Sequence, residues 1–579
     1  MKGNNGAFLG LLLAASAVAL CSCMPDAVPD IRVEAGTAVP EGMGLVIWID
    51  AVDLATFKKL QQSGQLPHIT RYLIDRGVTV EDAVASLPTI TYTNNVSFVT
   101  GLYPGHHGIT DNKWFDRYSL ICRDYNLIKA YRTVDRDYPG PTIYELLNDE
   151  FTASILTPIR RGATRNIDNW MQAGLSWFFD RSDMINKLTT WQFELVSRQA
   201  NAYGRWCKFI FAYYATPDDV CHRLGLTQPY EEILRHIDLQ VGLVCQSLER
   251  AGLLEKTTIA LVSDHGMVDT PNHLDLLRYF RKDLGVRTLN GDFGYDEMFE
   301  QRLEHFGPAR AVVCVGGDRH AAIHLRPGDR WHERPTPEEI NTFAARFGSG
   351  PAAGQAPLPE MLARLPATDL VMVRLGDDSV RLLGAGGEAT INRVRPSTGS
   401  GRPAFGSEAQ ARRELVEGRR DGVKLYRYTV TRGQDPLGYD AHPAMRPLLD
   451  GRGHDAEEWF RASLQTDRPD CIVQLMEMND SPRSGDIVLF AREGWDFGTH
   501  NLAGHGGVAR REIVVPWIWA GPGLPRKASV RGGRTVDLMP TMLHLIGRAR
   551  DVPPGLDGRS LADRLTRAGA ETPLLKPPP

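Results

Sequence analysis

The sequence predicts an α/β protein in which buried strands alternate with helices and a separate α+β region interrupts the core. Short apolar runs at residues 44–49 and 257–263 have the length of buried strands, and an aspartate directly follows each one. Helical patterns, with apolar residues three and four positions apart, lie between such runs. A stretch rich in glycine, proline and arginine breaks the alternation at residues 271–469. We therefore expect core segments at 42–270 and 470–566, with 271–469 inserted as an α+β cap.

Residues 1–22 have the pattern of a bacterial lipoprotein signal peptide. The apolar run from Phe8 to Leu20 is too short for a typical membrane span but has the length of a signal-peptide core. The segment Leu20-Cys-Ser-Cys23 resembles a lipobox, which implies cleavage before Cys23 and lipid attachment there. An ordinary secretory cleavage nearby is the alternative. We expect an exported lipoprotein of the bacterial cell envelope, anchored through Cys23, with a linker at 23–41 and a disordered tail at 567–579.

The composition describes a globular protein without a nucleic-acid partner. Apolar residues make up 42% of the 579 residues and charged residues 23%, both ordinary values, and the formal net charge is only −4. No basic excess therefore favours nucleic-acid binding. The cysteines after the leader are scattered and lack the close pairing typical of metal sites. One or two disulfides are possible, but the sequence does not indicate which cysteines would pair. The oligomeric state is not indicated.

The first core elements lead to a threonine at a predicted helix start. The strand at 44–49 ends at Asp50, and helices are expected at Leu54–Gln62 and over residues 66–75. Thr91 then precedes the apolar run 96–99, which places it at or just before a helix N-terminus. Backbone N–H groups and the helix dipole favour an anion there. A plain N-cap threonine is the alternative.

Two further groups of metal-ligand type follow predicted strands. After the strand at 208–214, Asp218 and His222 are four residues apart, so they share one helix face and could hold one ion. Asp219 faces elsewhere, and a surface ion pair is the alternative for the Asp–His pair. A helix at 229–253 leads to the strand at 257–263, whose tip carries Asp264-His265. The glycine that follows allows a sharp backbone turn, which suits a metal site.

The rest of the chain supplies the cap and a last histidine. Short strands are expected in the cap at 311–315, 321–325 and 370–375, with a glycine- and serine-rich loop at 384–407. The core is expected to resume with apolar runs at 470–476 and 486–490. A glycine-rich segment then carries His505 before a strand at 513–520 and a helix at 536–546. His500, five residues earlier, is the alternative ligand.

Together these groups supply three carboxylates and three imidazoles, the oxygen and nitrogen ligands that zinc accepts: Asp50, Asp218, Asp264, His222, His265 and His505. Two ions about 4 Å apart could clamp a phosphoryl group. They could also activate the Thr91 hydroxyl, which is a poor nucleophile at its ordinary pKa.

Several motifs resemble those of the alkaline phosphatase superfamily, most closely its nucleotide pyrophosphatase/phosphodiesterase branch. They are Pro88-Thr-Ile-Thr91 with Asn94, Thr100-Gly-Leu-Tyr-Pro104, Asp264-His-Gly-Met267 and His505-Gly-Gly507. The resemblance covers roughly residues 42–270 and 470–562. It implies a doubly wound, mostly parallel sheet flanked by helices, with the active site at the carboxyl ends of the strands.

The resemblance also implies a role for each site residue. One zinc ion would be held by Asp218, His222 and His505, and a second by Asp50, Asp264 and His265. Thr91 would bridge both ions and carry the covalent phosphoryl group. Asn94 would donate a hydrogen bond to a phosphoryl oxygen.

The expected function is a two-zinc hydrolase of small-molecule phosphate esters or nucleotides. Phosphodiesters are expected over monoesters, because the residues around Thr91 are neutral and Tyr92, Trp114 and Phe115 offer aromatic surface. Arg160 and Arg161, which could meet a dianion, weigh against this preference. The alternatives are a phosphomonoesterase, a phosphomutase (which the secretory leader opposes) and a non-catalytic envelope protein. A non-catalytic descendant should have lost metal ligands or the nucleophile, yet none of these residues is missing from the sequence.

Overall fold

The computed structural model describes residues 25–127, 133–168, 174, 176, 181–294, 296–394 and 424–569. The predicted leader, the lipid attachment at Cys23 and residues 570–579 of the predicted tail lie outside these ranges and stay predictions. The tail was expected to begin at residue 567, but Ala568 is buried against the core. Within the described ranges, no helix combines the length and the apolar character that crossing a membrane requires. All six described cysteines are buried free thiols, so no disulfide joins them.

The core is built on a mixed sheet that, within the described residues, has eight strands in the order β23-β2-β22-β8-β1-β7-β5-β6. Every neighbouring pair is parallel except the two that involve β22, which runs against β2 and β8. The predicted mostly parallel sheet is therefore confirmed. The strands are β1 (Met43–Ile49), β2 (Gly77–Val84), β5 (Thr152–Ile155), β6 (Arg165–Ile167), β7 (Phe209–Tyr214), β8 (Thr257–Val262), β22 (Val514–Ala520) and β23 (Ala528–Arg534).

Helices cover both faces of this sheet, as a doubly wound fold requires. Alternate side chains of β1 point to opposite faces, so Leu45 and Ile47 join one apolar cluster while Val46 and Trp48 join another. The first cluster packs against α2 (Leu54–Gln62), α3 (Pro67–Ile69), α8 (Ser182–Tyr203) and α10 (Gln228–Arg250). The second packs against α4 (Thr91–Thr100), α6 (Ile143–Leu146) and α19 (Leu538–Leu545). Each fully buried large apolar side chain contributes about 1.5–3 kcal/mol.

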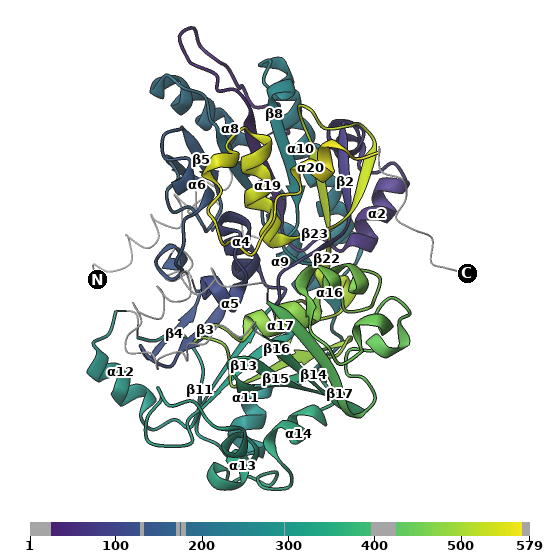
Figure 1. The fold of residues 1–579 in the computed structure, drawn as a ribbon. Helices are drawn as coiled ribbons and strands as arrows, with labels where there is room; N and C mark the ends of the chain where they lie inside the picture. The colour runs from purple at the N-terminus through teal and green to yellow at the C-terminus, as the bar shows by residue number, and fades with distance from the viewer. Residues whose placement is uncertain are drawn as a thin grey trace, which may run out of the picture.

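A second, mainly antiparallel sheet forms the other half of the molecule. Figure 1 shows it in teal and green below the core, which combines the purple N-terminal and yellow C-terminal segments. Its order, among described residues, is β11-β12-β13-β19-β14-β15-β16-β17-β18. The strands are β11 (Thr288–Leu289), β12 (Ala311–Gly316), β13 (His320–Leu325), β14 (Thr368–Gly376), β15 (Ser379–Gly384), β16 (Gly387–Val394), β17 (Leu425–Gly433), β18 (His454–Asp455) and β19 (Ile487–Ala491).

Helices again pack on the two faces of the second sheet. Side chains from α11 (Leu276–Arg278), α13 (Pro337–Phe347) and α14 (Leu358–Ala363) fill one apolar cluster. Those from α16 (Ala456–Ser463) and α17 (Cys471–Met478) fill a cluster on the other face, which also takes Val84, Leu87 and Tyr103 from the core. The two sheets are therefore joined by a continuous apolar layer.

Two sequence-based expectations about this region are wrong. The core was expected to resume at residue 470, but 471–478 form α17, and β19 lies between β13 and β14 of the second sheet. An apolar run shows that a segment is buried but not which sheet buries it. The predicted loop at 384–407 begins instead with β16, where Ala389 and Ile391 are buried and alternate with less buried residues. Residues 395–407 lie outside the described ranges.

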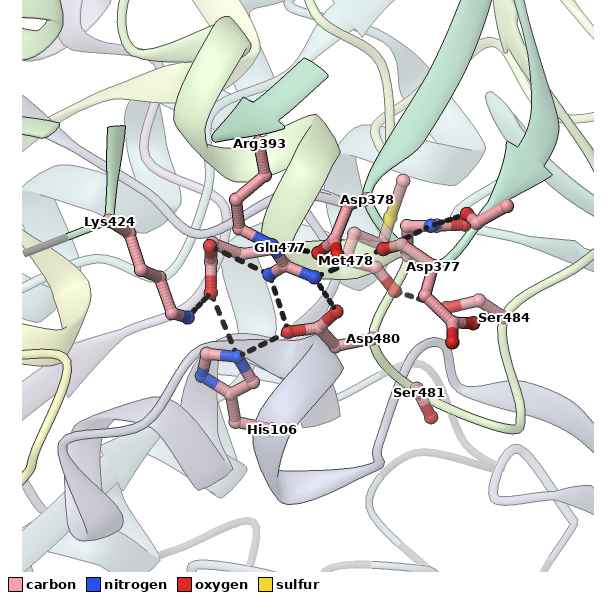
Figure 2. Close-up of polar contacts among 12 residues, drawn as sticks. His106, Asp377, Asp378, Arg393, Lys424, Glu477, Met478, Asp480, Ser481 and Ser484 are labelled. Atoms are coloured by element: carbon pink, nitrogen blue, oxygen red, sulfur yellow. Dashed lines mark hydrogen bonds and ion pairs between the residues drawn. The ribbon is translucent and has the colours of Figure 1, made fainter. Parts of the chain in front are cut away.

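An ion-pair network ties the core to the second sheet (Figure 2). His106 on α5 (Pro104–His107) lies with its Nε2 2.8 Å from Glu477 and 3.1 Å from Asp480, at the end of α17. Its Nδ1 lies 2.7 Å from Asp557 in the C-terminal segment. Arg393 pairs with both Glu477 and Asp480, so one cluster joins four distant parts of the chain.

The close approach of α5 to α17 makes Gly105 sensitive to substitution. A Cβ on Gly105 would lie 1.9 Å from the carbonyl oxygen of Glu477. We expect Gly105→Ala to lower the free energy of unfolding by about 1–3 kcal/mol, because the backbone must move apart. Gly376→Ala is the matched control, since no atom lies within 4 Å of its Cβ. Denaturant unfolding measures both, and equal stability of the two variants would contradict the expectation.

Candidate active site

The carboxyl ends of neighbouring parallel strands gather the predicted site residues. Asp50 directly follows β1, and Asp264 comes two residues after β8, with which β1 pairs in parallel. Beyond the end of β7, on the other side of β1, helix α9 (Thr216–Leu224) begins and carries Asp218 and His222. Asp264 and His265 are fully buried, and Asp50 nearly so. The sheet topology therefore brings together segments more than 200 residues apart.

His505 enters from the C-terminal half of the chain. It directly follows β21 (Ala503–Gly504), which pairs with β9 (Val268–Asp269) just after His265. Its Nε2 lies 3.6 Å from Oδ1 of Asp218, and its ring stacks on that of His265 at 3.7 Å. His500 is exposed and bonds to Thr499. The structure thus places His505, and not His500, beside the carboxylates.

The potential ligand atoms form two overlapping groups. Asp50, Asp264 and His265 make one group, and Asp218, His265 and His505 make the other, each with its ligand atoms within 4.8 Å of one another. His222 adjoins the second group, with Nε2 3.4 Å from Oδ1 of Asp218. His265 therefore lies between the two groups rather than in one of them alone.

Backbone hydrogen bonds orient all three imidazoles in the same sense. The Nδ1 atoms lie 2.8 Å from the carbonyl oxygen of Ala503 for His222, 3.0 Å from that of Gly266 for His265 and 2.8 Å from that of Thr89 for His505. A carbonyl oxygen only accepts, so each Nδ1 carries the proton. Each Nε2, which faces the carboxylates, is therefore the nitrogen available to bind a cation.

The neighbouring carboxylates of the cluster repel one another, so added positive charge would stabilise it. Burial, together with Asp264 and Asp218, raises the pKa of Asp50 well above its usual value. Burial and the neighbouring His265 lower the pKa of His505, so its ring is neutral. Burial alone would lower the pKa of His222, but Asp218 and Asp318 raise it to about 9.

Unpaired carboxylate oxygens show that a cation fits this cluster. Among described residues, Oδ1 of Asp50, Oδ1 of Asp218 and Oδ2 of Asp264 are buried without a hydrogen-bond donor. A buried carboxylate oxygen is costly unless it is paired or binds a metal. Three such oxygens beside imidazole Nε2 atoms form a donor set suited to zinc.

Thr91 faces this cluster from the start of a helix. It is the first residue of α4, is only 7% exposed, and its Oγ1 lies 3.2 Å from Nε2 of His265. The predicted position at a helix N-terminus is confirmed. The positive end of the helix dipole, together with the N–H groups of the first turn, favours an anion beside the hydroxyl.

Asn94 does not fit the oxyanion-donor role that the resemblance implied. Its Nδ2 faces the carbonyl oxygens of Ser86 and Ile90 at 3.0 and 3.2 Å, and its Oδ1 accepts from the Ser86 N–H at 2.7 Å. These bonds point the amide back into the turn before α4. Asn94 therefore stabilises the backbone that presents Thr91.

Asn112 is a better-placed donor that the sequence analysis missed. Its Oδ1 accepts from the Tyr92 N–H at 3.0 Å, which holds the amide over the first turn of α4. Its Nδ2 has no acceptor within the described part of the chain. Tyr213, also missed, donates its hydroxyl to Asp50 and stacks on Trp48 at 3.7 Å. The position of Tyr213 in the strand before Asp218 was the only available signal.

A third group of metal-ligand type consists of His106, Glu477 and Asp480, and it lies in the ion-pair network that ties the core to the second sheet. Arg393 pairs with both carboxylates, and the Lys424 amine lies 2.5 Å from Glu477 (Figure 2). These protein cations already neutralise the group. It therefore acts as a structural ion-pair network rather than a metal site.

Comparisons with known proteins identify the family. The family model for type I phosphodiesterase/nucleotide pyrophosphatase matches residues 45–350, more than half of the chain. This chain belongs to that family. The match includes Asp50, Thr91, Asp218 and Asp264 but ends before His505.

Individual relatives are distant. Human ectonucleotide pyrophosphatase/phosphodiesterase family member 5 is 26% identical over 236 residues, covering 38% of this chain and 44% of the relative. A bis(5'-adenosyl)-triphosphatase from Pongo abelii is 27% identical over 210 residues, covering 35% and 43%. The chain thus spans less than half the length of these curated relatives.

Solved structures extend the likeness to the whole fold. Murine ectonucleotide pyrophosphatase/phosphodiesterase 5 superposes with a TM-score of 0.51 at 15% identity, covering 91% of this chain and 99% of the other. An inactive threonine-to-alanine variant of that mouse protein, in complex with AMP, has a TM-score of 0.50 at 15% identity, covering 90% and 99%. The second half of the molecule therefore also belongs to the shared fold.

The two asparagines near Thr91 are expected to differ when substituted. Asn94→Ala should lower the free energy of unfolding by about 1–3 kcal/mol, because it leaves the buried Ser86 N–H without that acceptor. Asn112→Ala should lower the free energy of unfolding less than Asn94→Ala does, since only the Tyr92 N–H loses its acceptor. It should nevertheless reduce phosphate-ester turnover on the order of 10²-fold. Thermal or denaturant unfolding, combined with turnover measurements, checks both. A stable Asn94→Ala variant with the larger loss of turnover would reverse the assignment.

Proposed function

We propose that this protein is a two-zinc hydrolase of phosphate esters that acts through a covalent phosphothreonine at Thr91. The observation that carries the proposal is the convergence of two carboxylate–imidazole groups on a hydroxyl at a helix N-terminus. Family membership supports phosphate-ester hydrolysis. Asp50, Asp264 and His265 would hold one zinc ion, and Asp218, His222 and His505 the other.

Zinc in this position would neutralise the phosphoryl group and lower the pKa of the Thr91 hydroxyl. Thr91 Oγ1 would attack phosphorus as its proton passes to solvent. The bond from phosphorus to the leaving oxygen would break, and that oxygen would take a proton from solvent and leave as an alcohol. Water hydrolyses the resulting phosphothreonine and restores the hydroxyl. Asn112 would donate its Nδ2 hydrogens to a phosphoryl oxygen, beside the N–H groups of α4.

Phosphodiesters and nucleotides are the proposed substrates. Arg160 and Arg161, which could have favoured a dianionic monoester, are paired with Asp168 and Glu145. A relative that binds AMP supports a nucleotide in the site. Trp114 and Phe115 are buried, so the expectation that they offer aromatic surface to a substrate is wrong. Tyr92 lies beside Thr91, and its ring stacks on that of Tyr125 at 4.7 Å.

Two alternatives have weaker support. A phosphomonoesterase of the same superfamily would be favoured by a cation aimed at Thr91, but the two arginines considered for that role already have partners. A non-catalytic protein would tolerate loss of the site, whereas the structure brings all six expected ligands and Thr91 into one cluster.

Zinc binding should release protons from the metal-free protein. The pKa of His222 is raised to about 9, so this ring is protonated at pH 7 and must lose its proton before Nε2 can bind zinc. The apparent zinc affinity should therefore rise about tenfold per pH unit from pH 7 and level off above about pH 9. Zinc affinity measured by chelator competition across this pH range tests the expectation. The control is His222→Gln, whose zinc affinity should lose this dependence on pH. An affinity that does not change with pH would contradict the expectation.

The nucleophile can be tested with a matched pair of threonines. Thr91→Ala should retain both zinc ions but lose turnover by about 10³-fold or more. Thr93→Ala on the same helix should keep most activity, because the Thr93 hydroxyl is buried without a hydrogen-bond partner among described residues.

Elemental analysis and nitrophenyl esters provide the measurements for both variants. The unchanged protein should hydrolyse a nucleotide diester with a higher kcat/KM than a nitrophenyl monoester. Undiminished hydrolysis by Thr91→Ala would show that water attacks directly, and a monoester preference would point to a phosphatase.

A further inference from the structure

The second sheet contributes a turn that contacts the metal-ligand cluster. This turn joins β12 to β13 and contains Gly317, Asp318 and Arg319. The N–H of His505 donates to the carbonyl oxygen of Gly317 at 2.8 Å, and the N–H of Arg319 donates to that of His505 at 3.1 Å. Gly317 has φ +53°, and a Cβ there would lie 2.5 Å from the His505 carbonyl oxygen. His505 is therefore held on both sides by backbone from the other half of the molecule.

The Arg319 side chain extends this contact inward. It is fully buried, with Nε 2.8 Å from Oε1 of Glu512 and Nη2 3.1 Å from Oε2. The remaining N–H groups donate to the backbone carbonyl oxygens of Ala491, Arg492 and Trp495. Such a two-point contact between guanidinium and carboxylate fixes the plane of both groups.

Glu512 connects this ion pair to both histidine segments. Its Oε1 accepts from the N–H of Gly507, two residues after His505, at 2.7 Å. Its backbone carbonyl accepts from the N–H of Gly266, one residue after His265, at 2.9 Å. A Cβ on Gly507 would lie 2.4 Å from Oε2 of Glu512, so the segment packs directly on the carboxylate.

A buried ion pair is by itself weak evidence for a functional role. Arg117 and Asp486 form an equally buried pair in the second half of the molecule. Asp486 also accepts from the Leu325 N–H and pairs with Arg334, and none of these residues belongs to the metal-ligand cluster. What distinguishes the Arg319–Glu512 pair is therefore the position of Glu512. Its carboxylate accepts from the segment that carries His505, and its backbone carbonyl accepts from the segment that carries His265.

We propose that Arg319 is a positioning residue for the metal centre, acting through Glu512 to hold His265 and His505 with their Nε2 atoms toward the carboxylates. The inference rests on the proposed zinc-dependent function. Groups that orient metal ligands from behind change metal affinity when they are removed. The second sheet would thus contribute to metal binding through Arg319.

The test compares Arg319→Met with Arg117→Met in the full-length protein. Both changes remove a buried guanidinium from an ion pair, so both should lower thermal stability. Arg319→Met should weaken zinc binding, measured by chelator competition, by about 10–100-fold. Arg117→Met should leave zinc affinity near that of the unchanged protein. Arg319→Lys keeps the charge without the planar contact and should give an intermediate loss.

Amide hydrogen exchange of the metal-free proteins supplies a second readout. Arg319→Met and Arg319→Lys should both speed exchange in the peptide that contains Gly507, whereas Arg117→Met should not. Wild-type zinc affinity and unchanged exchange in the Arg319 variants would overturn the proposal. If Arg319→Met fails to fold, Arg319→Lys decides by the same two readouts. If the unchanged protein binds no zinc, the proposed function fails, and exchange at Gly507 still decides the positioning role.

Discussion

The structure depends on a concentration of negative charge at the ends of its central strands. Asp50 and Asp264 are buried beside each other, and Asp218 faces them from the first turn of α9. Like charges in a low-dielectric site repel strongly, so the folded state tolerates them only with protons or a cation among them. The three histidines, each oriented by a backbone carbonyl, and the N-terminus of α4 surround this charge. Under the proposed metal-dependent function, binding of a cation at this cluster would therefore also stabilise the folded state.

The two halves of the molecule serve the site in different ways. The core half supplies five of the six expected ligands and Thr91. Asp50, Asp264 and His265 follow parallel strands, Asp218 and His222 lie on α9 after the next parallel strand, and Thr91 begins α4. The second sheet supports the sixth, His505, through backbone bonds from the turn at Gly317 and Arg319. The apolar layer and the network around His106 hold the halves in register, which keeps that turn against His505.

Local sequence signals predicted the core and much of the site. Apolar runs followed by aspartate marked β1 and β8, and four-residue spacing placed Asp218 and His222 on one helix face, as the structure shows. The role of Asn94 was misjudged because the direction of a side chain depends on the turn around it. Asn112 carries no local signal, and Tyr213 carries only its position in the strand before Asp218, since the importance of both residues comes from the neighbours that folding provides. Strand β2 was missed because Glu81 and Asp82 interrupt its apolar pattern at a bulge.

The antiparallel strand β22 lies between β2 and β8, although it comes more than 250 residues after β8 in the chain. Until residues 514–520 are made, β2 has no hydrogen-bonded connection to β8 and the other described strands of the core sheet, and β23, its other partner, is made later still. Contacts of such long sequence separation slow folding, because a large loop must close before the pairing can form. A nascent chain therefore exposes the unpaired edge of β8 while the whole second sheet is made. The order of synthesis leaves this edge open to aggregation until residues 514–520 have been made.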